Sequence, residues 1–137
     1  MAPLTGLVAC AIYLLSVAHN AGSIQVLPEC KGNKAIAENV RRLLAVEVIV
    51  AKRQLPEPGY KCDLEFRAHQ YVNTNPGGPE PMFGDNVVYS EGNDEKFNVE
   101  KVVGEWKDGL EKMGDKSKFG CNLSIDDNRY KVACVFE

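Results

Sequence analysis

The N-terminal apolar run most constrains this chain, because it sets the chemical environment in which the cysteines fold. Leu7 to Val17 are eleven consecutive residues without charge, too few to span a bilayer as a helix. No Lys, Arg, Asp or Glu precedes Glu29, and Ser16-Val17-Ala18 presents small residues at the positions that a signal peptidase reads. We therefore predict a signal peptide over residues 1–18 and one secreted domain over residues 19–137.

Removal of a signal peptide takes Cys10 away and leaves four cysteines in the mature chain. An even number in a secreted chain of this size predicts two disulfides, for which three connectivities are formally open. A zinc site is disfavoured because no two of these cysteines have the C-x2-C spacing of zinc modules. The four are Cys30, Cys62, Cys121 and Cys134.

One disulfide follows from the register of a predicted hairpin. Lys118 to Asp126 and Arg129 to Glu137 are strand-like runs, separated by two residues, Asp127 and Asn128, that tolerate left-handed backbone. A two-residue turn there places Cys121 opposite Cys134, at a non-hydrogen-bonded position suited to a cross-strand disulfide. By elimination, Cys30 pairs with Cys62.

The same register predicts one buried and one solvated face of the hairpin. Asn122 begins an Asn-Leu-Ser sequon on the solvated face, so we expect an accessible candidate for N-glycosylation. The predicted buried face carries Phe119, Leu123, Ile125, Tyr130, Val132 and Phe136 beside the cysteines, and the solvated face carries Asn122, Ser124, Asp126, Arg129 and Lys131.

The rest of the chain is predicted to be helical, with one short strand over Asn86 to Ser90. Helices are expected from an Asn33 cap to Gln54, over Asp63 to Val72, and from an Asn98 cap to a stop at Gly114, with Trp106 in the core. Within the first of these helices, the β-branched run Val46 to Val50 is also compatible with a strand. Its inward residues are predicted to be Ile36, Val40, Leu43, Leu44, Val48, Ala51 and Leu55, and those of the second Leu64, Ala68, Tyr71 and Val72.

A long loop, Asn73 to Asp85, contains three prolines and three glycines and has no periodic pattern. A rigid scaffold that carries one long loop tends to bind its partner there. We therefore predict a binding loop that includes Asn75, Pro76, Glu80, Met82, Phe83 and Asp85.

The composition favours neither catalysis nor a cofactor. A formal net charge of -3 gives no electrostatic reason to expect nucleic acid. The chain has two histidines, His19 and His69, and the latter is expected to be a surface or half-buried polar residue. Glu91, Asp94 and Glu95 lack the spacing of a calcium loop. We expect no enzyme activity, no metal, no cofactor and no transmembrane segment after signal cleavage.

Three motifs resemble the secreted CAP superfamily. Tyr60-Lys61-Cys62-Asp63-Leu64-Glu65 followed by Ala68 is similar to its Y-x-C-x-L-E-x-x-A helix opening. Phe83-Gly84-Asp85-Asn86 with Tyr89-Ser90 resembles its G-E-N segment. The closing hairpin of the superfamily is similar to Phe119 to Asn122 with Lys131 to Phe136, and these residues resemble in sequence the SAG surface antigens of Eimeria-type coccidian parasites. The resemblance implies an α+β fold, a CAP-like α-β-α sandwich with about three helices and a small antiparallel sheet.

The resemblance also implies a function. CAP proteins often carry a cavity with two histidines and two acidic residues, but Asp85 replaces the G-E-N glutamate here and no histidine follows Trp106. We therefore expect a non-enzymatic parasite antigen that binds a host-cell surface molecule or a host protein. Since the sequence shows no lipid-anchor tail after Glu137, release is expected over anchoring. The alternatives are a cystatin-type inhibitor of cysteine proteases and a CAP-like effector that binds a lipid or sterol.

Overall fold

The computed structural model describes residues 26–73 and 86–137, so the predicted signal peptide and the loop residues from 74 to 85 lie outside the described residues. In chain order, the elements are α2 (Glu38–Lys52), β1 (Gly59–Tyr60), α3 (Cys62–Val72), β2 (Val87–Asn93), the 3-10 turn η2 (Asp94–Lys96), α4 (Val99–Glu105), α5 (Lys107–Lys112), β3 (Lys118–Asp126) and β4 (Arg129–Phe136). No helix among the described residues is long and apolar enough to cross a bilayer.

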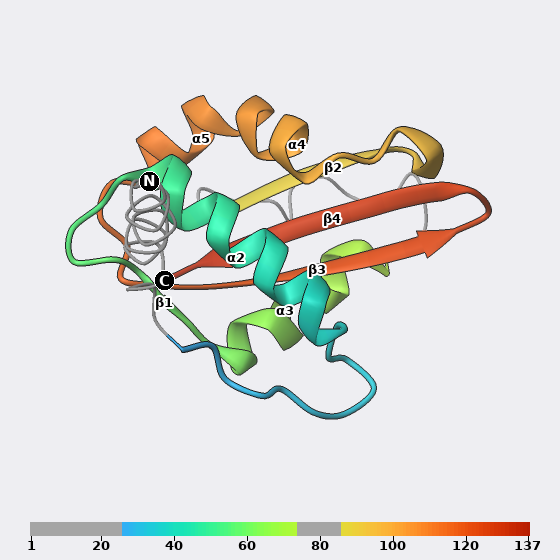
Figure 1. Ribbon diagram of the computed structural model, residues 1–137, viewed down its shortest axis with the longest axis horizontal. Coiled ribbons are helices and arrows are strands. Elements are labelled where there is room, and N and C mark those ends of the chain that lie inside the picture. Colours follow the sequence, from blue (N-terminus) through green and yellow to red (C-terminus); the bar gives the residue numbers. More distant parts are fainter. Residues whose placement is uncertain (1–25, 74–85) are drawn as a thin grey trace, which may run out of the picture.

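The hairpin of β3 and β4 forms the centre of the sheet (Figure 1). Asp127 and Asn128 both have left-handed backbone, with φ of 51° and 62°, which allows a two-residue turn that matches the twist of the strands. Cys121 therefore pairs with Cys134 across the hairpin, as the sequence predicts. Their Cα atoms are 4.0 Å apart and their sulfurs form a disulfide.

The sheet has four strands in the order β1-β3-β4-β2. β2 is antiparallel to β4, but β1 is parallel to β3, so the expected antiparallel sheet is a mixed one. β1 is only two residues long, Gly59 and Tyr60, and its pairing with Lys118 and Phe119 depends on contacts distant in sequence. A period-2 pattern cannot be recognised over two residues.

Helices cover both faces of the sheet, which gives the expected α-β-α sandwich (Figure 1). α2, α4 and α5 pack on the face that carries Cys121, Val132 and Cys134. α3 packs on the opposite face, where Leu64, Ala68 and Val72 contact Ala133 and Val135. The prediction of one solvated hairpin face is therefore wrong near the C-terminal end of β4, because α3 covers it; Asp126 and Arg129 at the turn are exposed.

α2 is shorter than predicted. It begins at Glu38 after Ala37, which provides no side-chain cap, so Asn33 does not cap it. It ends at Lys52, and Val46 to Val50 are helical. Leu43 is 54% exposed and Leu55 is 88% exposed, contrary to prediction. The buried residues of α2 are Arg41, Leu44, Ala45, Val48 and Ile49.

The third predicted helix consists of two short helices. Asn98 caps α4 as predicted, because its side chain accepts a hydrogen bond from the Lys101 amide. Trp106 lies at the junction with α5; its ring is buried and its Nε1 donates to Ser90 Oγ at 3.2 Å. Gly114 follows α5 with a φ of +67°, the conformation expected of a helix stop.

Gly120 provides a test of how closely α3 packs on the sheet. A Cβ at this position would overlap the Glu65 amide nitrogen and lie 2.7 Å from the Lys61 carbonyl oxygen, and neither backbone atom can move without shifting α3. We expect Gly120→Ala to lower the free energy of unfolding by about 3 kcal/mol. In the control, Gly104→Ala, the new methyl meets nothing within 4 Å and should raise helix stability by up to about 1 kcal/mol. Urea denaturation followed by circular dichroism measures both; equal stabilities would contradict the packing.

Candidate functional site

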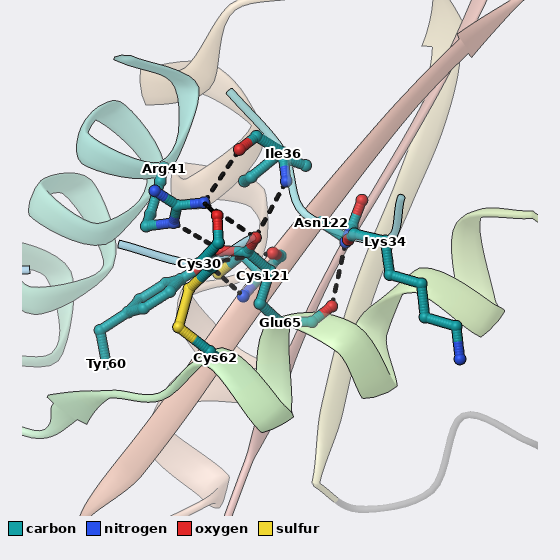
Figure 2. The surroundings of a disulfide bond; sticks show 9 residues. All are labelled: Cys30, Lys34, Ile36, Arg41, Tyr60, Cys62, Glu65, Cys121 and Asn122. Atoms are coloured by element: carbon teal, nitrogen blue, oxygen red, sulfur yellow. Dashed lines mark hydrogen bonds and ion pairs between the residues drawn. A yellow bond between two sulfur atoms is a disulfide. The ribbon is translucent and has the colours of Figure 1, made fainter. Parts of the chain in front are cut away.

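The second disulfide joins the segment before α2 to the start of α3. Cys30 and Cys62 form the pair reached by elimination, with Cα atoms 5.4 Å apart. The bond fixes one end of an irregular segment over residues 30–37, here called the clamped segment. Figure 2 shows that this disulfide borders a group of polar side chains from α2, α3, β1 and β3.

Glu65 is the centre of that group. Its side chain is fully buried at 0% exposure, and its carboxylate accepts from four donors. Oε1 receives Arg41 Nε at 2.7 Å and the Tyr60 hydroxyl at 2.6 Å. Oε2 receives the Ile36 amide at 2.9 Å and Arg41 Nη2 at 3.1 Å. A buried carboxylate is tolerated only when it is paired and hydrogen-bonded, and here both conditions hold.

The motif spacing explains how three of these residues meet. Cys62 and Glu65 are three residues apart on α3, so they lie on the same side of the helix. Tyr60 lies in β1, just before this turn, and its ring packs edge-on against Phe119 at a centroid distance of 5.2 Å. Its hydroxyl can therefore reach Glu65 and also accept from the Cys121 amide at 3.2 Å.

Arg41 connects α2 to the clamped segment. The residue is 2% exposed, and its guanidinium donates to the carbonyl of Ile36 at 2.9 Å and to that of Cys30 at 3.5 Å, besides its bonds to Glu65. The hydrogen bond to Glu65 raises the pKa of Arg41 above its usual value. Burial, with the charge of Glu65, raises the pKa of Tyr60 far above its usual value, so this hydroxyl keeps its proton.

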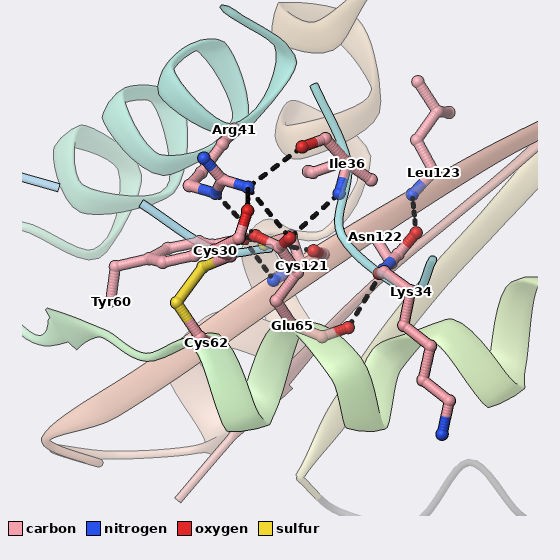
Figure 3. Close-up of polar contacts among 10 residues, drawn as sticks. All are labelled: Cys30, Lys34, Ile36, Arg41, Tyr60, Cys62, Glu65, Cys121, Asn122 and Leu123. Atoms are coloured by element: carbon pink, nitrogen blue, oxygen red, sulfur yellow. Dashed lines mark hydrogen bonds and ion pairs between the residues drawn. A yellow bond between two sulfur atoms is a disulfide. The ribbon is translucent and has the colours of Figure 1, made fainter. Parts of the chain in front are cut away.

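Asn122 holds the clamped segment from the sheet, as Figure 3 shows. Its Nδ2 donates to the carbonyls of Lys34 at 2.8 Å and Glu65 at 3.0 Å, while its Oδ1 accepts from the Leu123 amide. The side chain is 3% exposed, so the predicted solvent exposure of this sequon residue is wrong. A glycan on Nδ2 would replace one amide hydrogen, which breaks one of these two bonds, and would need space that the buried side chain lacks; both points argue against glycosylation of the folded protein.

A pocket of about 240 Å³ opens beside the clamped segment. It lies between this segment, the C-terminal part of α3 and β3, and includes the half-buried His69. Its polar lining residues are Asn33, Lys34, His69, Asn73, Asn122 and Ser124.

The other candidates from the sequence lie elsewhere. The binding-loop residues Asn75, Pro76, Glu80, Met82, Phe83 and Asp85 lie outside the described residues. Glu91 accepts from the Tyr89 hydroxyl at 2.9 Å and pairs with Arg129 at 3.9 Å. Within the described ranges, no three His, Cys, Asp or Glu side chains are grouped as a metal site.

The network of Arg41 and Glu65 was not predicted from the sequence. One signal was available: Arg41 interrupts the apolar side of α2, and an arginine at a core position requires an acidic partner. The partner could not be identified, because Glu65 is 24 residues away and reads as an ordinary charged residue in a helix's first turn.

The comparisons identify the family. A family model described as Ancylostoma-associated secreted protein related (ASPR) matches residues 29–136. The chain belongs to this CAP-related family. Among curated proteins, none matches the sequence.

Solved structures of CAP proteins share the fold. The hookworm platelet inhibitor is 12% identical, with a TM-score of 0.63 over 79% of this chain and 74% of that one. Manganese-bound Ac-ASP-7 is 15% identical, with a TM-score of 0.56 over 82% and 77%. MpPR-1i is 17% identical, with a TM-score of 0.55 over 75% and 90%. The family match and these neighbours support the CAP resemblance and the sandwich fold, whereas the narrower likeness to coccidian SAG antigens stays a prediction.

Breaking the buried ion pair should strongly destabilise the fold. Glu65→Gln leaves the Arg41 guanidinium buried without a countercharge, so we expect the free energy of unfolding to fall by about 3 to 5 kcal/mol. The control is Glu38→Gln. It removes the exposed partner of Arg42, 3.1 Å away within α2, and should lower the free energy of unfolding by less than about 1 kcal/mol. Chemical denaturation compares the two variants; similar losses would show that the buried pair has no special role.

Tyr60 should make stability fall in alkali. Its pKa is raised on folding, so the native state holds this proton more tightly than the unfolded chain. Its contribution is fully present below the unfolded tyrosine value of about 10 and is lost as pH rises above it. We expect unfolding free energy to decline above about pH 10 more steeply in the wild type than in Tyr60→Phe, which keeps Tyr130 and all other tyrosines. Parallel curves would contradict this.

Proposed function

We propose that this protein is a secreted, non-enzymatic CAP-fold protein that binds a host molecule through the clamped segment. The observation that carries the proposal is the fastening of an irregular, exposed segment by buried groups. Cys30 is held by a disulfide, the Lys34 carbonyl by Asn122, and the backbone of Ile36 by Glu65 and Arg41. A surface segment fixed before binding loses less conformational entropy when a partner binds.

The exposed side of the clamped segment supports recognition. Lys31, Asn33 and Lys34 are exposed, while the segment is anchored at Cys30, at the Lys34 carbonyl and at the backbone of Ile36. Figure 3 shows the Lys34 side chain extending away from the buried network. The segment therefore separates two roles, with backbone atoms that anchor and side chains that face a partner.

The chemistry of the buried groups supports a role without catalysis. All four cysteines of the described residues are in disulfides, so none offers a thiolate. Glu65 is bound to four donors, and the raised pKa of Tyr60 keeps its hydroxyl protonated. These groups hold one another in place, and none is poised to exchange a proton with a substrate.

The named relatives support a host-directed role. The hookworm platelet inhibitor carries an action on platelets in its name and shares the fold at 12% identity. The family is described as secreted, which supports export of this chain also. The sequence motif of the closing hairpin, which resembles that of SAG antigens, extends the proposal to a coccidian surface antigen that is secreted or lies at the parasite surface. The family match favours a CAP-related protein over a cystatin-type inhibitor. The polar residues that line the pocket beside the clamped segment do not favour the binding of a lipid or sterol.

Charge reversal on the clamped segment tests this function. The variant with Lys31→Glu and Lys34→Glu should bind cultured host cells at least about tenfold more weakly, a change of about 1.4 kcal/mol. The matched control, Lys101→Glu with Lys107→Glu, changes two exposed lysines of α4 and α5 by the same charge and should bind as the wild type does. Flow cytometry of labelled protein measures the difference.

Two outcomes would contradict the proposal. Unchanged binding of the segment variant would show that the contact lies elsewhere, and the predicted binding loop, Asn73 to Asp85, would be the next region to exchange. An equal loss in the control would show attraction by overall charge instead of a specific surface. Circular dichroism of both variants confirms that each is folded.

A further inference from the structure

The pocket beside the clamped segment has an unusual charge for this chain. The molecule has a formal net charge of -3, yet the charged side chain lining the pocket is Lys34, with the imidazole of His69 on the facing helix. No carboxylate is among the residues that line this pocket in the described part of the chain. The nearby Glu65 is neutralised by its bonds to Arg41.

The end of α3 opposes this charge only weakly. A helix C-terminus carries about half a negative charge, so the positive charge of Lys34 exceeds it. The ammonium is exposed at the end of a flexible stem, which lets it approach a ligand group in the pocket. An anionic group is therefore the charged group that the pocket favours.

Neutral hydrogen-bonding groups surround this basic side. Asn33, Asn73 and Ser124 line the pocket, and each can both donate and accept. Asn73 uses one amide hydrogen on the His69 carbonyl, at 3.1 Å, and keeps its amide oxygen as an acceptor. Asn122 is different, because both its amide hydrogens are already donated to the carbonyls of Lys34 and Glu65.

Apolar side chains complete the wall. Val40 and Leu123 line the pocket between the polar groups and are both partly buried. A ligand with one negative group, several hydroxyls and a small apolar face would match these three kinds of lining. A sugar ring that carries a carboxylate has all three.

From this match, and resting on the proposed host-binding function, we infer that the pocket binds an acidic sugar unit of a glycan, a uronic or sialic acid. The carboxylate pairs with Lys34, and the hydroxyls exchange hydrogen bonds with Asn73 and Ser124. An acidic peptide fits less well, because an Asp or Glu side chain offers one carboxylate and no hydroxyls for the neutral groups. The hydrogen bonds of Asn122 to the Lys34 carbonyl and of the Ile36 amide to Glu65 hold one wall of the pocket in place before the sugar binds.

Titration of the isotope-labelled full domain by nuclear magnetic resonance tests the inference. The probes are glucuronic acid and N-acetylneuraminic acid in the millimolar range, with glucose and acetate as comparison ligands. We expect saturable amide shifts at Asn73 and Ser124 with at least one acidic sugar. Lys34→Gln should weaken that binding at least about tenfold, whereas Lys101→Gln, which changes an exposed lysine of α4 outside the pocket lining, should leave it unchanged.

The contrary results are equally specific. Absence of saturable shifts with both acidic sugars would overturn the inference, and so would binding that Lys34→Gln leaves intact. Equal binding of acetate would reduce the pocket to an adventitious anion site only. Host-cell binding can fail the two proposals separately. If binding requires the clamped segment but persists after sialidase treatment and in excess acidic sugar, this inference alone is overturned. If the wild-type protein binds no host cells, the proposed function is overturned, and the sugar titration still tests the pocket by itself.

Discussion

The carboxylate of Glu65 is the interaction on which the arrangement of this molecule depends. It joins β1 through Tyr60, α2 through Arg41 and the clamped segment through the Ile36 amide. The disulfide of Cys30 with Cys62 and the hydrogen bond of Asn122 to the Lys34 carbonyl also fasten the clamped segment, and apolar contacts join the other parts. Because apolar contacts lack direction, the ion pair is what gives these contacts one geometry.

The two disulfides have different structural roles. Cys121 and Cys134 close a loop with a sequence separation of 13 inside a hairpin that its turn and register already define. Cys30 and Cys62 are separated by 32 residues and join parts that share no secondary structure. A longer closed loop removes more freedom from the unfolded chain. The second bond also fixes an exposed segment in the folded state, so it contributes both to stability and to the proposed binding surface.

The sequence predicted what local rules determine. The turn at Asp127 and Asn128, the register of Cys121 with Cys134 and the cap at Asn98 each depend on residues close in the chain or directly paired. The start of α2 could not be predicted, because the Ile36 amide is taken by Glu65, 29 residues away. Burial of Asn122 was missed for the same kind of reason: an asparagine in a strand reads as polar surface unless the helix above it is known.

These features change how the family motif is understood in this chain. Tyr60, Cys62 and Glu65 look like a set of chemically capable groups, yet each is engaged in holding a neighbouring part of the structure. Cys62 and Glu65 also hold the backbone of residues 30–37 at Cys30 and at Ile36, while several of its side chains are exposed. A motif that fastens a segment leaves the exposed residues of that segment open to change without loss of the fold. Specificity for a partner would then reside in side chains such as Lys34, while the buried carboxylate maintains the frame that presents them.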